Sequence, residues 1–141
     1  MKAISVRAPW WWFILHAGKD IENRDWPTRF RGTVLLHASR WWRLDEVQED
    51  SADAIECYNA AKRLIANKEF TYRELRDIGG HIVGKVDIVD CVSSSDSPWF
   101  FGKYGFVLAN PVAFERPIPC KGALGLFDIP SDILNIVERA A

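Results

Sequence analysis

Three charged residues with a fixed spacing form the part of this chain best suited to chemistry. Lys19 follows Gly18 directly, and Glu22 and Arg24 come three and five residues after Lys19. An aromatic run that includes Trp10 precedes this segment. Charge is costly to bury unless it is paired or used, so these polar groups beside an apolar segment indicate a functional site. A lysine whose pKa lies near neutral pH acts as a base or nucleophile, whereas a fully charged lysine anchors phosphate. The sequence leaves both roles open for Lys19, together with an ion-pair network that only braces the loop.

The same segment offers two catalytic interpretations. In a hydrolase, Lys19 would be the base or nucleophile, and Glu22 would orient it or hold a metal ion. Asp20, Glu22 and Asp25 together could bind magnesium, which takes one or two carboxylates plus water and substrate phosphate; the alternative is ordinary solvated charge. The sequence contains no HExxH, GxSxG or glycine-rich phosphate loop, and His37 lies in an apolar run typical of a buried core histidine.

Basic and aromatic residues are concentrated at the start of the chain. Residues 1–43 carry eight Lys or Arg against three acids and six of the seven tryptophans, whereas the remaining residues have a net charge of −6. Basic side chains interleaved with aromatic rings suit a ligand with phosphates and flat rings. The ordinary alternative is a tryptophan core with an arginine rim. Because the whole chain has a net charge of −1, a short nucleic acid or a nucleotide fits better than a long polymer.

The candidate ligand contacts lie in and around the charged segment, which comprises residues 19–25. They are Arg7, Trp10, Lys19, Glu22, Arg24, Trp26, Arg31 and Lys121. Lys19 and the arginines would meet phosphate, and one of the tryptophans would be the platform for a ring. Lys121 begins a run of small residues, 121–125, where the backbone either approaches a ligand closely or only turns. The aromatic segment 99–104 either stacks a base or closes an edge of the core.

The hydrophobic pattern predicts one α+β domain over residues 1–141. Strands are predicted at residues 3–6, 32–38, 82–92, 106–109, 112–116 and 123–129, and the charged segment itself is either a loop or a short strand. Helices are predicted between Pro9 and Gly18, over residues 44–67, after the capping box of Thr71 and Glu74, and after Pro130 with a buried stripe at residues 133, 134, 136 and 137. A mostly antiparallel sheet without βαβ regularity predicts a small barrel with flanking helices.

Composition excludes several classes of protein. With 141 residues, 48% hydrophobic and 26% charged, the chain is an ordinary globular one, and no apolar run approaches the roughly 18 residues that span a bilayer. The three cysteines are widely spaced and odd in number, which argues against a disulfide framework and a cysteine-rich zinc site. We therefore expect a cytoplasmic protein with reduced thiols and no membrane partner, and the oligomeric state is not predicted.

Taken together, these motifs resemble the ASCH domain family, named for activating signal cointegrator proteins. The similarity lies in residues 5–10, 18–28, 31–39, 104–108 and 119–126, and the family pattern GxKxxExR is matched in full. The resemblance implies a PUA-like fold, a small β-barrel with helices around it, and a cleft lined by Lys19, Glu22 and Arg24. It also implies RNA or a modified nucleotide as the partner.

The resemblance also bears on catalysis. Some ASCH relatives are acetylcytidine amidohydrolases, and ribonuclease activity occurs in others. Lys19 matches the catalytic lysine of the amidohydrolases, but Glu22 stands where they have threonine, and their third residue, a glutamate, has no counterpart that we can place. Ala8 also departs from the glutamine that usually precedes the proline. A binding domain is therefore the first hypothesis and a hydrolase the second, and a protein-interaction domain whose cleft is only structural is the third.

Overall fold

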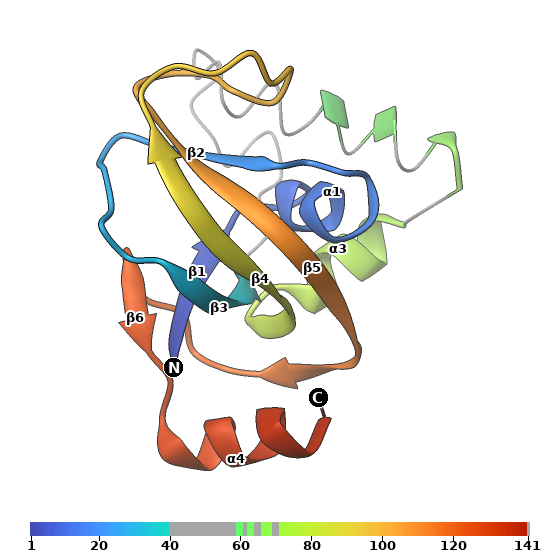
Figure 1. Ribbon diagram of the computed structural model, residues 1–141. Coiled ribbons are helices and arrows are strands. Elements are labelled where there is room, and N and C mark those ends of the chain that lie inside the picture. The colour runs from blue at the N-terminus through green and yellow to red at the C-terminus, as the bar shows by residue number, and fades with distance from the viewer. Residues whose placement is uncertain (40–58, 61, 64–65, 69–70, 141) are drawn as a thin grey trace.

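The computed structural model describes residues 1–39, 59–60, 62–63, 66–68 and 71–140, which form a curled six-stranded sheet with helices on both faces (Figure 1). The strands are β1 (Lys2–Val6), β2 (Ile21–Arg24), β3 (Gly32–Ala38), β4 (His81–Val92), β5 (Tyr104–Pro119) and β6 (Leu126–Asp128). Their order is β2-β5-β4-β3-β1-β6, and every neighbouring pair is antiparallel except β1 with β3. This arrangement confirms the predicted α+β domain with a small, mostly antiparallel barrel-like sheet.

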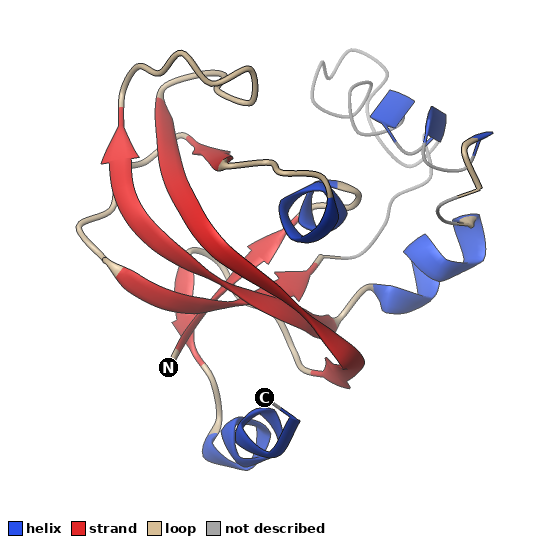
Figure 2. Ribbon diagram, turned by 45° about the vertical axis from the view of Figure 1, so that its right-hand side comes forward, coloured by secondary structure: helices blue, strands red, loops and turns tan. Residues whose placement is uncertain are grey.

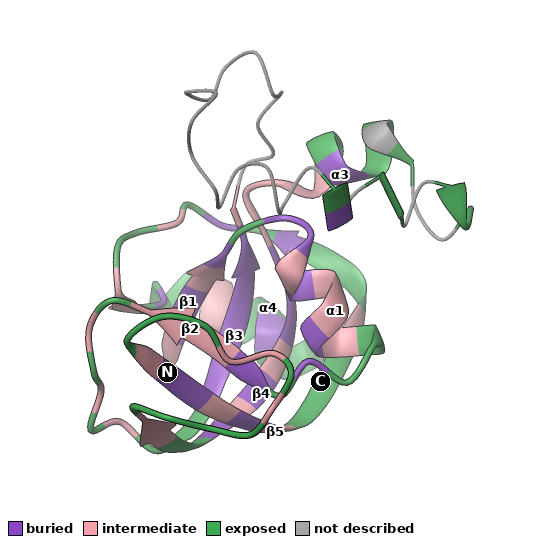
Figure 3. Cartoon of the chain, turned by 90° about the horizontal axis from the view of Figure 1, so that it is seen from above, coloured by how far each residue is buried: buried purple, intermediate pink, exposed green. Residues whose placement is uncertain are grey.

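The buried residues form two hydrophobic cores on opposite faces of the sheet, and the C-terminal helix lies apart from the other helices (Figure 2). Helices α1 (Trp10–His16) and α3 (Tyr72–Ile78) contribute Trp11, Ile14 and Leu75 to the larger core, and α4 (Ser131–Ala140) contributes Val137 to the smaller one. Successive residues of a strand point to opposite faces, so β3 supplies both cores, and its buried residues are apolar except for His37. The central strands are accordingly the most buried part of the molecule (Figure 3).

The charged segment follows a sharp reversal of the chain after α1. Pro9 precedes the helix as predicted, and Gly18 adopts a left-handed conformation with φ of 73°. The backbone N–H of Lys19 then donates to the carbonyl oxygen of Phe13, at 3.1 Å. Of the segment expected as a loop or short strand, Ile21–Arg24 form the edge strand β2, which pairs with β5, and Lys19 lies just before this strand.

Several details differ from the sequence-based expectation. The two strands predicted around Asn110 form one strand, β5, because Asn110 and Pro111 make a bulge opposite β4 instead of a turn. Asn110 has a positive φ of 54°, and its side chain donates to Asp87 at 2.9 Å. The last strand begins at Leu126 and is shorter than predicted, and Ile136 is 47% exposed instead of buried.

The remaining predictions concern caps, cysteines and membrane spans. Thr71 caps α3 by accepting a hydrogen bond from the Glu74 backbone, whereas most of the predicted helix at 44–67 lies outside the described residues. Cys91 and Cys120 are free thiols. Across the described ranges, no helix has the length and apolar character needed to cross a membrane.

Candidate functional site

A cleft of about 540 Å³ opens beside β2, where β1 and β3 end. Its lining combines charged, aromatic and small residues: Ser5, Arg7, Trp10, Lys19, Glu22, Asn23, Arg24, Asp25, Trp26, Ser39, Trp99, Phe101, Gly102, Lys103, Ala123 and Leu124. Six of the eight candidate ligand contacts predicted from the sequence therefore lie around one space, although they come from α1, β2 and the segments that flank these two elements.

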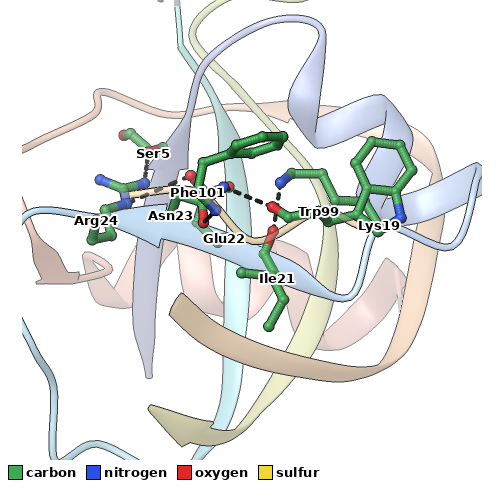
Figure 4. A network of polar contacts seen from close by, with 8 residues as sticks. All are labelled: Ser5, Lys19, Ile21, Glu22, Asn23, Arg24, Trp99 and Phe101. Atoms are coloured by element: carbon green, nitrogen blue, oxygen red, sulfur yellow. Dashed lines mark hydrogen bonds and ion pairs between the residues drawn. The ribbon is translucent and has the colours of Figure 1, made fainter. Parts of the chain in front are cut away.

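Glu22 and Arg24 form the polar floor of the cleft. They are two residues apart on β2, so both side chains project from the same face of the strand. Arg24 donates through Nη2 to the carbonyl oxygen of Ser5 at 2.7 Å, and its Nε lies 3.6 Å from Oε1 of Glu22 (Figure 4). Within the described part of the chain, Oε2 of Glu22 and Nε of Arg24 are buried without a hydrogen-bond partner. The floor thus holds one acceptor and one donor that are not satisfied by the protein residues described.

Lys19 lies in a wall of the cleft and is only 6% exposed. Its Nζ donates to the carbonyl oxygen of Ile21 and lies 5.6 Å from the ring centroid of Trp10 and 5.5 Å from that of Trp99. Burial lowers the pKa of Lys19 below its usual value of 10.5, and the nearby charges of Glu22 and Asp20 oppose this shift. The amine is therefore held between two indole rings, where burial makes its charged form less favourable than it is in water.

The aromatic loop at residues 93–103 is tied to the charged segment by its polar residues. Asn23 donates to the carbonyl oxygen of Trp99 at 2.9 Å and accepts from the backbone N–H of Phe101 at 2.8 Å. Asp20 accepts a hydrogen bond from the Ser97 hydroxyl at 2.6 Å. Sequence reasoning missed this role of Asn23, although its place between Glu22 and Arg24 was a signal. The aromatic segment was expected either to stack a base or to close an edge of the core. The structure places its Trp99 and Phe101 along the cleft.

Arg31 and Lys121 are the two candidate contacts that do not line the cleft. Arg31 donates to the carbonyl oxygens of Thr28 and Phe30, at 3.1 and 2.9 Å, and lies 3.5 Å from a carboxylate oxygen of Asp90. Lys121 is exposed on the segment before β6. Both side chains therefore carry their positive charge outside the cleft.

The acids of the charged segment do not converge on one point. Among the residues that the structure describes, no group of three His, Cys, Asp or Glu side chains could hold a metal ion. Asp20 is engaged by Ser97, and Glu22 lies beside Arg24. The three acids therefore do not form a single cluster, and a magnesium ion held by one or two of these carboxylates stays a prediction of the sequence.

His37 anchors the segment that forms the rim of the cleft opposite the aromatic loop. Its Nε2 donates to the carbonyl oxygen of Cys120 at 2.7 Å, and its Nδ1 accepts from the Ser5 hydroxyl at 2.9 Å. Burial lowers the pKa of His37, which favours the neutral ring, and the Cys120 carbonyl oxygen requires the proton to be on Nε2. Gly122 packs on the ring so closely that an added Cβ would lie 2.6 Å from Cε1. The core role predicted for His37 is confirmed, and the segment it holds presents Leu124, 98% exposed, at the rim.

Comparison with known proteins identifies the family. The ASCH domain family matches residues 4–118, which is more than half of the chain. The chain belongs to the ASCH domain family. This ASCH domain is also 26% identical over 143 residues to human activating signal cointegrator 1, and the alignment covers 92% of the chain but 22% of the human protein. The charged residues of the floor and Lys19 lie inside the matched range, whereas the rim at Ala123 and Leu124 lies beyond it.

Proposed function

We propose that this ASCH domain binds single-stranded RNA or a modified nucleotide in the cleft beside β2. The observation that carries the proposal is the lining itself, in which three tryptophans and several cations surround one space. Indole rings stack on nucleobases of any type, and cations attract the phosphates that connect them. The membership in a PUA-like family with RNA-related members supports the same ligand class.

The position of each cation suggests its role. Arg7 and Lys103 are exposed and line the cleft, so they are well placed to meet phosphate groups. Lys19 is buried between Trp10 and Trp99 and contributes positive charge from within the wall when it is protonated. A nucleotide would thus enter with its ring toward the tryptophans and its phosphate toward the exposed side chains of Arg7 and Lys103.

A salt titration with two matched variants tests the proposal. We expect the affinity for a short fluorescent RNA to fall steeply between about 50 and 200 mM salt, because each neutralised phosphate releases counterions. Replacing Arg7 with Ala should weaken binding and make the slope of log K against log salt shallower by about 0.7. Arg31→Ala removes the same charge outside the cleft and should leave both unchanged. Equal effects of the two variants, or no binding at low salt, would contradict the proposal.

A hydrolase acting on RNA or on an acylated nucleoside is the second candidate. One observation favours it: burial lowers the pKa of Lys19, which increases the fraction of free amine available as a base or nucleophile. Turnover of RNA or acetylcytidine, followed by chromatography, should then disappear in Lys19→Met while the thermal unfolding transition is retained. If the wild-type protein yields no product from either substrate, this candidate is excluded and the binding proposal is unaffected.

A further inference from the structure

We infer that the floor of the cleft recognises the hydrogen-bonding edge of guanine, with Glu22 accepting its two adjacent N–H donors and Arg24 donating to its carbonyl oxygen. This inference rests on the proposed function, because it requires that a nucleotide enters the cleft.

The inference starts from two polar atoms that the described protein residues leave unsatisfied. The side chain of Glu22 is 12% exposed and that of Arg24 is 20% exposed, yet Oε2 of the first and Nε of the second lack a hydrogen-bond partner in the ranges described. The 3.6 Å between Nε and Oε1 is too long for a good hydrogen bond between the two side chains. Buried polar groups are normally paired, so this pair of atoms indicates a ligand.

The guanidinium cannot easily turn away from this position. Its Nη2 is already committed to the carbonyl oxygen of Ser5 at 2.7 Å, which keeps Nε on the side of Glu22 (Figure 4). The floor therefore presents two carboxylate acceptors and then one donor, in the order Oε2, Oε1 and Nε. A carboxylate only accepts and a guanidinium only donates, so the pattern is not reversed by rotating a hydroxyl or an amide.

Guanine matches this pattern better than the other bases. Its Watson–Crick edge carries the exocyclic amino group, the ring N–H and then a carbonyl oxygen, which are two adjacent donors followed by an acceptor. Uracil has a single N–H between two carbonyl groups, and adenine and cytosine each have one amino group beside ring acceptors. Only guanine can therefore satisfy both carboxylate oxygens of Glu22 while it accepts from Arg24.

The charge of Glu22 also fixes the direction of the ligand. A phosphate placed beside this carboxylate would be repelled, whereas a neutral base would not. The phosphate is accommodated at the solvent-exposed side of the cleft, where Arg7 and Lys103 are exposed. Trp26 borders the same floor and is held by an edge contact with Phe106 at 5.1 Å between ring centroids, so a fixed indole lies beside the inserted base.

The test uses five-nucleotide uridine RNAs that differ only in the central base, which is guanine, hypoxanthine, adenine, cytosine or uracil. We expect the guanine RNA to bind about tenfold or more tightly than the others, including hypoxanthine, which lacks only the amino donor. Glu22→Gln should remove this preference, because the amide has one acceptor and presents a donor to a donor. Glu138→Gln makes the same change on the exposed face of α4 and should keep the preference.

The outcomes separate this inference from the proposed function. If all five RNAs bind equally and with a steep salt dependence, the inference is overturned and the proposed function stands. If none binds at low salt, the proposed function fails and the inference fails with it. A guanine preference that survives Glu22→Gln overturns the inference alone, and if that variant does not fold, the guanine–hypoxanthine comparison on the wild type decides.

Discussion

Lys19 is a buried amine that lies between the indole rings of Trp10 and Trp99 in a wall of the cleft. The spacing of Lys19, Glu22 and Arg24 was enough to predict that they belong to one site, because strong charges followed an apolar helix. Their partners were not predictable in the same way. Ser5 and Asn23 are ordinary polar residues in the sequence, and only the pairing of distant strands brings them to the floor and to the aromatic loop.

The burial of Lys19 has a consequence for stability at alkaline pH. Its pKa in the folded protein lies below the ordinary value of 10.5, so between these two values the unfolded chain binds more protons than the folded one. The free energy of unfolding therefore gains a contribution from Lys19 as pH rises through this window. We expect the wild type to gain stability relative to Lys19→Met as the pH rises from the lowered pKa of Lys19 toward 10.5, measured by urea unfolding.

The exposed Lys121 provides the control for that experiment. Lys121→Met removes one positive charge without removing a buried amine, so its stability relative to the wild type should stay constant over the same pH range. Parallel pH dependences of the wild type and Lys19→Met would show that Lys19 is not buried in solution as the structure has it.

At the scale of elements, the cleft depends on how the loop at residues 93–103 is attached to β2. Asn23 makes two hydrogen bonds to this loop, one to Trp99 and one to Phe101. We expect Asn23→Ala to lower the free energy of unfolding by about 1–2 kcal/mol and to speed amide exchange in the loop. Asn135→Ala on the exposed face of α4 is the matched control. Unchanged exchange in the loop would contradict the role given to Asn23.

The segment before β6 is attached in a different way, through the close approach of Gly122 to His37. A Cβ at this position would meet Cε1 of His37 at 2.6 Å and Oγ of Ser5 at 3.0 Å, so Gly122→Ala should cost about 1–3 kcal/mol. The cost should be smaller when His37 is already alanine, because the ring that clashes is gone. A double-mutant cycle by chemical unfolding measures this coupling, and strictly additive effects would show that the two residues do not touch.

Elements with a strong local pattern were predictable, and elements that depend on pairing were not. The α1 helix, its glycine end and the capping box of α3 follow from local residue preferences. The continuity of β5 does not, because Asn110 and Pro111 form a common turn pair and only the long partner β4 turns them into a bulge. The exposure of Ile136 likewise depends on how much of α4 the sheet covers, which no helical periodicity specifies.

At the scale of the whole molecule, the charge asymmetry of the sequence has a spatial counterpart. The N-terminal part, rich in Lys, Arg and Trp, supplies most of the cleft, although the net charge of the chain is −1. Under the proposed function, this balance predicts that nucleic acid is attracted to one concave site instead of to the whole surface. The fold class could be predicted from the sequence. The shape of the cleft also depends on the aromatic loop at residues 93–103 and on the segment before β6, which are distant from β2 in the sequence.

The tryptophan indole signals give the most direct test of this account, because they report from inside and outside the cleft in one spectrum. In a ¹⁵N-resolved NMR titration with the five-nucleotide guanine RNA, we expect the indole N–H signals of Trp10, Trp26 and Trp99 to shift, since all three line the cleft. The signals of Trp11 and Trp12, which do not line it, should move little. Shifts confined to Trp11 and Trp12, or no shift at low salt, would contradict the claim that RNA occupies this cleft.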